Sequence, residues 1–159
     1  MQYHSVSGVI VDLLKTNSLW FEAFEHEPVR TSEEAAKIRH GYSIQQGAKA
    51  LIIKIYPGER FVMLVVPGNL KFDEKKVIAL LGVRKLRFAT EDEVLKITGG
   101  VEPGGVPPFG NLFNLETYVE EKLFENEKII FNAGDKRFSV AMNSSDYRTL
   151  LNPKVASIT

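Results

Sequence analysis

Residues 104–110 combine glycines and prolines in a pattern that can perform chemistry without a reactive side chain. Pro107 and Pro108 lack amide donors and fix φ, so neither a helix nor a central strand can run through them. The amide groups left in the segment belong to Gly104, Gly105, Val106, Phe109 and Gly110. A regular ladder cannot use all of them, so this stiff loop is a candidate cradle for a carbonyl, carboxylate or phosphate oxygen. The alternative interpretation is a Pro/Gly surface turn.

Lys49 is the second candidate, because it stands at the entry of the apolar stretch formed by residues 48–53. An ammonium group is costly there unless it faces a pocket or water. The residue either serves a bound ligand or is a strand-end lysine whose ammonium extends into solvent.

The usual reactive groups are missing from the chain. It has no cysteine, which excludes a cysteine nucleophile, thiolate zinc sites, iron–sulfur clusters and disulfides, and which favours a cytoplasmic location. His4, His26 and His40 do not have a metal-binding spacing such as HExxH. We expect His40 to cap a helix, and His26 is a candidate for lining a pocket. No nucleophile–base pair, nucleotide-binding fingerprint or cofactor site is evident, so an enzymatic mechanism would use backbone donors, a lysine and groups of the substrate.

Length and composition are those of one globular domain over residues 1–159, with 44% hydrophobic and 25% charged residues. No apolar run is long enough to cross a bilayer, and no signal-peptide pattern opens the chain. Basic and acidic residues number 20 each, and this zero net charge argues against a general nucleic-acid coating protein. Any contact with nucleic acid would be local. Residues 75–76, 84–87 and 136–137 are candidates, although each cluster is also typical of a solvated face.

Apolar spacing and capping residues predict the elements that must position these groups. The expected helices cover residues 5–15, 31–40, 73–81, 90–97 and 115–124, and a last one runs from 144 or 145 to 151. The expected strands cover residues 19–24, 48–55, 61–66, 85–88, 128–132 and 138–142, and Pro57 and Gly58 turn a hairpin between the second and third. This pattern predicts the α+β class.

Several segments, in this order, resemble the YbaK/ProX family of aminoacyl-tRNA deacylases, which is related to the editing domain of bacterial prolyl-tRNA synthetases. The resemblance covers roughly residues 20–150. It rests on a T-x-E-E-A-A helix start at residues 31–36, an A-K-x-L strand at 48–51, and a GxxxPxG loop. Gly104, Pro108 and Gly110 occupy the defining positions of that loop. Residues 65–68, 98–99 and 132–134 also match, in the expected order.

The resemblance implies a single domain with a mixed or antiparallel, barrel-like sheet flanked by helices. It also implies hydrolysis, in trans, of the ester between a wrong amino acid and the 3′ CCA end of a mischarged tRNA. The amino acid would be small, such as Ala, Ser or Cys, on tRNA-Pro or a related tRNA. A synthetase would be a further partner, and the terminal ribose hydroxyl would assist the reaction.

Family knowledge gives catalytic importance to Lys49 and a substrate-cradling role to the loop. Backbone donors at Gly104 and Gly105 would stabilise the oxyanion, each worth about 3 kcal/mol. We expect Lys49 to pair with a 3′-end phosphate or to orient the ester rather than to act as a nucleophile. The remaining substrate-binding residues would be Val106, Pro107, Pro108, Phe109, Gly110, Phe24, His26, Thr31, Asn132 and Gly134.

Some positions depart from the family pattern. Ala50 replaces a hydroxyl residue after the lysine, and Asn132 stands where serine is common. The alanine-selective subgroup uses a histidine in the C-terminal half, which this chain lacks, so the Ala-tRNA(Pro) specificity is disfavoured. Two other readings stay open: a non-catalytic module that binds a tRNA acceptor end or a synthetase, and an interaction domain whose Pro/Gly loop is only a turn.

Overall fold

The computed structural model describes residues 2–28, 31–38 and 41–159. Its strands are β1 (Phe21–Glu25), β2 (Ala48–Tyr56), β3 (Arg60–Pro67), β4 (Lys85–Phe88), β5 (Thr117–Glu120), β6 (Lys128–Asp135), β7 (Phe138–Asn143) and β8 (Lys154–Ala156). They form a three-stranded sheet of order β1-β7-β6 and a five-stranded sheet of order β4-β2-β3-β5-β8. The helices are α1 (Ser5–Thr16), α2 (Ser32–Ile38), α3 (Glu74–Leu81), α4 (Glu91–Thr98) and α5 (Ser144–Leu151).

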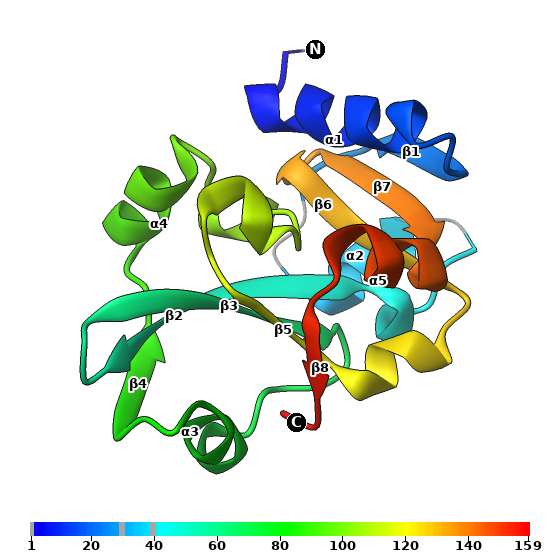
Figure 1. Ribbon diagram of the computed structural model, residues 1–159. Helices are drawn as coiled ribbons and strands as arrows, with labels where there is room; N and C mark the ends of the chain where they lie inside the picture. The colour runs from blue at the N-terminus through cyan, green and yellow to red at the C-terminus, as the bar shows by residue number, and fades with distance from the viewer. Residues whose placement is uncertain (1, 29–30, 39–40) are drawn as a thin grey trace.

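The two sheets differ in strand direction. The smaller sheet is antiparallel, whereas the larger one combines antiparallel pairs of β2 with β3 and β4 and parallel pairs of β5 with β3 and β8. A parallel bridge between Gly47 and Ile130 joins the sheets. The α+β class with mixed sheets is therefore confirmed, but the expected barrel-like closure is not found, because the strands remain in two sheets (Figure 1).

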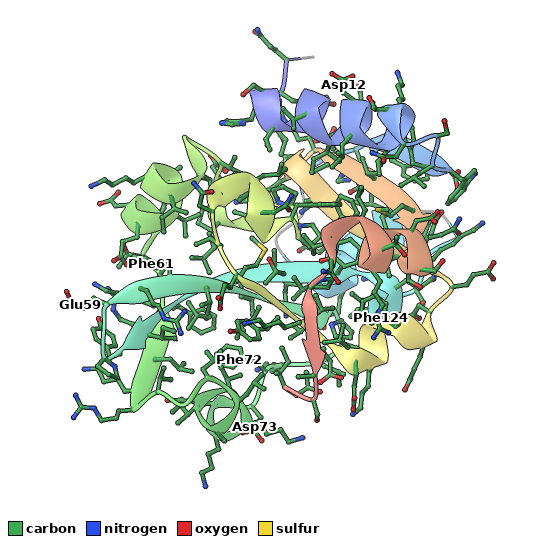
Figure 2. All side chains as sticks on the ribbon, viewed as in Figure 1. Asp12, Glu59, Phe61, Phe72, Asp73 and Phe124 are labelled. Carbon is green, nitrogen blue, oxygen red and sulfur yellow. The ribbon has the colours of Figure 1, made fainter. Side chains whose placement is uncertain are left out.

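Two hydrophobic clusters hold these layers together. The main core takes residues from both sheets and from α1, and it includes the fully buried Phe131 and Tyr147. The second cluster lies between the five-stranded sheet and α3, whose positions Figure 1 shows, and it includes Val77, Ile53 and Leu64. Phe72 lies at the edge of this second cluster, just before α3 (Figure 2). None of the helices in the described ranges is long and apolar enough to cross a membrane.

Local capping signals locate several helix boundaries correctly. The Asp73 carboxylate accepts hydrogen bonds from the amides of Lys75 and Lys76 at the start of α3, and Gly82 ends that helix at φ 65°. Thr90 and Glu93 form the expected capping box of α4. These bonds satisfy amides that a helix leaves unpaired at its first turn.

The helix expected over residues 115–124 is wrong. Residues 117–120 form strand β5, which lies parallel to β3 and pairs Met63 with Thr117, and a 3-10 turn (Glu121–Glu125) follows. Thr117, Tyr118 and Val119 are β-branched or aromatic, so they favour a strand once β3 offers an edge. The strand β8 that covers β5 was also not expected.

Tyr147→Phe is expected to lower the free energy of unfolding by about 1–3 kcal/mol, because the buried Tyr147 hydroxyl donates to the Pro108 carbonyl at 2.6 Å. The phenylalanine would leave that carbonyl buried without its donor. Urea denaturation measures the change. Tyr118→Phe is the matched control, since its hydroxyl bonds the half-exposed Glu116 carboxylate and its loss should cost less. Equal costs for the two variants would contradict the prediction.

Candidate active site

The segment from residue 104 to residue 110 is not a surface turn. Gly104 is exposed, but the residues from Gly105 to Gly110 are buried. Phe109 packs edge-to-face on Phe131 and Tyr147, with ring centroids 5.5 and 5.3 Å apart. The second half of the loop is therefore part of the main core.

Most of the loop amides bond within the loop. The Gly105 amide donates to the Glu102 carbonyl at 2.8 Å, and the Phe109 amide donates to the Pro107 carbonyl at 2.8 Å. The Val106 amide makes a longer bond of 3.5 Å to the Pro103 carbonyl. Within the described residues, the amides of Gly104 and Gly110 have no acceptor, and Gly104 alone of these two is exposed. The Gly104 amide is therefore the donor best placed for a ligand.

A chain of polar side chains fixes the Gly104 peptide. The Asn132 amide Nδ2 donates to the Gly104 carbonyl at 2.8 Å, and Asn132 Oδ1 accepts from Ser139 Oγ at 3.2 Å. Behind them, His26 Nε2 lies 2.7 Å from Ser139 Oγ. The carbonyl of Gly104 and the amide of Gly105 belong to one peptide plane, and both are bonded, so the plane is held at both ends.

Lys49 lies on the face that carries this polar chain. Lys49, Asn132 and Ser139 each stand between strand neighbours that belong to the main core or pack against it, so their side chains point to the opposite face. Lys49 and Asn132 each come two residues after the bridge between Gly47 and Ile130, which runs parallel. The two side chains are therefore brought to neighbouring positions at the junction of the sheets.

The surroundings of Lys49 disfavour its charge. Burial lowers the pKa of Lys49, an effect that the Glu33 carboxylate partly offsets and the Lys71 ammonium reinforces. In the described part of the chain, no ion pair or hydrogen bond reaches the Lys49 ammonium. Such a half-buried cation is suited to an anionic or polar ligand.

The remaining residues that were predicted to line the substrate site do not all lie on the polar face. Phe24 pairs with Ser139 across the strands and packs on Tyr42, with ring centroids 6.0 Å apart, so it borders the polar face. Thr31 is exposed, and its hydroxyl accepts from the Glu34 amide as a helix cap. Gly134 is buried at φ 97°, where a Cβ would lie 2.6 Å from Val6 of α1. His40 lies outside the described residues.

Sequence reasoning missed Ser139, and it identified Lys136 only as part of the basic cluster at residues 136–137. Ser139 pairs directly with Asn132 between β6 and β7, and the register of the predicted hairpin could have indicated it. The aliphatic part of Lys136 covers Gly104: a Cβ there would lie 2.6 Å from Lys136 Cε. No local sequence signal indicates that contact, which joins positions 32 residues apart.

Comparisons with known proteins agree with this fold. A crystal structure described as a candidate trans-editing enzyme for prolyl-tRNA synthetase superposes with a TM-score of 0.83 at 25% identity, over 99% of both chains. The multifunctional Ser/Thr-tRNA deacylase ProXp-y of Escherichia coli K12 is 29% identical over 93% of this chain and 89% of its own. The prolyl-tRNA editing protein ProX of Acetoanaerobium sticklandii is 34% identical over 75% of this chain and 69% of its own.

The fold and these relatives thus define the class of small α+β editing hydrolases that act on aminoacyl-tRNA. Residues 26–150 match the model of the aminoacyl-tRNA editing domain, and the chain belongs to that family. The resemblance to YbaK/ProX proteins is confirmed, as is the expectation of a hydrolase that acts on mischarged aminoacyl-tRNA.

Proposed function

We propose that the protein works in trans in the cytoplasm and releases serine or threonine from a mischarged tRNA. The exposed Gly104 amide, beside the bonded pair of Asn132 and Ser139, is the observation that carries this proposal. The name of the Escherichia coli relative, a Ser/Thr-tRNA deacylase, supports the choice of amino acid. Proline–tRNA ligases also match the chain, at 26% identity for that of Stenotrophomonas maltophilia, which supports a synthetase as partner.

In the proposed reaction, water adds to the ester carbonyl carbon with help from the free hydroxyl of the terminal ribose. The carbonyl oxygen becomes an oxyanion, which the Gly104 amide and the Lys49 ammonium stabilise. The bond from the carbonyl carbon to the ribose oxygen then breaks, and that oxygen takes up the proton that the attacking water gave up, which releases the amino acid and the uncharged tRNA. A donor placed like the Gly104 amide is worth about 3 kcal/mol to the transition state. Val106 to Gly110 would support the loop from the core. Gly105, which has no side chain, would let the substrate approach the backbone closely.

Selectivity would come from polar groups as well as from size. A partly exposed amide group such as that of Asn132 can bond the hydroxyl of a seryl or threonyl group, whereas an alanyl group offers none. A site built to bond a hydroxyl discriminates strongly against analogues that lack it. A panel of tRNAs charged with Ser, Thr, Cys or Ala tests the proposal, and we expect Ser release to be at least about tenfold faster than Ala release. Release from no member of the panel would contradict the proposed activity.

Asn132→Ala is expected to lower kcat by about tenfold or more with a smaller change in KM, because the peptide between Gly104 and Gly105 loses the donor that holds it, and this peptide directly follows the Gly104 amide. Single-turnover deacylation of the preferred substrate measures the effect. Asn17→Ala is the control, since Asn17 caps α1 on the surface. An Asn132→Ala protein with unchanged kcat would exclude this positioning role.

A further inference from the structure

A hollow of about 410 Å³ opens beside the Gly104 peptide, within the usual size range of small-ligand sites, about 300–1,000 Å³. It lies between the start of α1, the loop that precedes Gly105, and the turn between β6 and β7. We call it the Gly105 hollow. Its lining includes His4, Glu102, Gly105, Gly134, Lys136 and Arg137.

Two of the basic side chains that line the hollow already form hydrogen bonds within the protein. Arg137 donates to both carboxylate oxygens of Asp135, at 2.8 and 2.7 Å, and stacks over the Tyr3 ring. The His4 ring accepts from the Val6 amide at Nδ1 and bonds the Gly99 carbonyl at Nε2. Neither group can turn to a ligand without breaking these bonds.

Lys136 differs from them. Among the described residues its ammonium has one ion-pair partner, Glu102, at 3.5 Å, and the Glu102 side chain is 68% exposed. Exposed ion pairs of this kind contribute little to stability, so another anion can replace the carboxylate. A phosphodiester is such an anion, since it is charged and offers several acceptor oxygens.

The position of Lys136 identifies the anion. Its aliphatic stem lies against Gly104, because a Cβ built on Gly104 would lie 2.6 Å from Lys136 Cε. The Lys136 ammonium and the Gly104 amide are therefore neighbouring positive groups. An aminoacyl ester on the 3′-terminal ribose has its nearest phosphodiester within the same nucleotide. A substrate with its ester at Gly104 therefore brings that phosphodiester within reach of the Gly105 hollow.

We propose that Lys136 exchanges Glu102 for the phosphodiester of the terminal nucleotide, and that Glu102 competes with tRNA for this lysine. The inference rests on the proposed function, because it takes the ester to lie at Gly104. It assigns phosphate binding to Lys136 and leaves Lys49 to act on the ester. It also gives a zero-net-charge chain one local contact with nucleic acid.

The test compares wild type, Lys136→Met, Lys136→Arg and Glu102→Gln on seryl-tRNA over a range of salt concentrations. Lys136→Met should raise KM about tenfold and reduce the salt slope of log(kcat/KM) by about 0.7, the value for one single-strand phosphate. Lys136→Arg should stay near wild type, and Glu102→Gln should lower KM. Lys122→Met, which removes an exposed cation from the 3-10 turn Glu121–Glu125, should change nothing.

Seryl-adenosine, which has no phosphodiester, separates this inference from the proposed function. Wild type and Lys136→Met should hydrolyse it equally. If wild type hydrolyses seryl-tRNA and Lys136→Met shows the same KM and salt slope, the inference is wrong while the function stands. If wild type hydrolyses neither compound, the proposed function is wrong. The role of Lys136 is then tested separately by the salt dependence of binding to uncharged tRNA. Equal salt slopes for wild type and Lys136→Met would contradict phosphate binding by Lys136.

Discussion

Gly110→Ala is expected to lower the free energy of unfolding by about 3 kcal/mol or more. A Cβ at Gly110 would collide with Thr117 Oγ1 and would lie 2.8 Å from the Leu115 carbonyl oxygen. The backbone at Thr117 cannot retreat easily, because β5 is paired to β3 on one side and to β8 on the other. Urea denaturation measures the loss.

Gly8→Ala provides the matched control for this substitution. Gly8 lies exposed within α1, and a Cβ there would meet nothing within 4 Å, so alanine should stabilise the protein by about 0.5–1 kcal/mol. Adding Thr117→Ala to Gly110→Ala should recover part of the loss, since it removes the colliding hydroxyl. A Gly110→Ala protein as stable as Gly8→Ala would show that the loop is not packed against β5.

Features fixed by neighbouring residues were predictable from the sequence. Asp73 and Thr90 mark helix starts because each side chain bonds amides two or three residues later. The hairpin of β2 and β3 followed from apolar runs on either side of Pro57 and Gly58. The prediction for residues 117–120 was wrong because their structure depends on a parallel partner strand more than 50 residues away. Strand propensity depends strongly on such context.

The candidate site was predictable only in part, for the same reason. The loop and Lys49 were found through motifs, each contained in one short segment. The bond from Asn132 to the Gly104 carbonyl joins residues 28 apart, and the burial of Phe109 depends on Phe131 and Tyr147. A sequence pattern can indicate amides that no regular ladder uses. Only the folded loop shows which of these amides donate to carbonyls of the protein itself.

Lys49→Met is expected to lower kcat/KM by about a hundredfold or more, while the melting temperature does not fall. Methionine keeps most of the volume of the stem but removes a charge that burial disfavours, so activity and stability should change in opposite directions. Deacylation kinetics and thermal unfolding measure the two effects. Lys54→Met is the matched control on the same strand: Lys54 pairs with Glu93 at 3.9 Å, so its loss should lower stability slightly and spare activity.

The pH dependence of stability provides a second test of Lys49. Its pKa is lower in the folded protein than in the unfolded chain, so between these two values the unfolded chain binds more protons. Stability contributed by this residue therefore rises as pH rises through that window, and Lys49→Met should lose this rise. Activity has the opposite sign: if the ammonium stabilises the oxyanion, the rate falls as Lys49 loses its proton, at a pH below the ordinary lysine range. A Lys49→Met enzyme with the wild-type rate and pH profile would remove Lys49 from the mechanism and leave the Gly104 amide as its main electrostatic element.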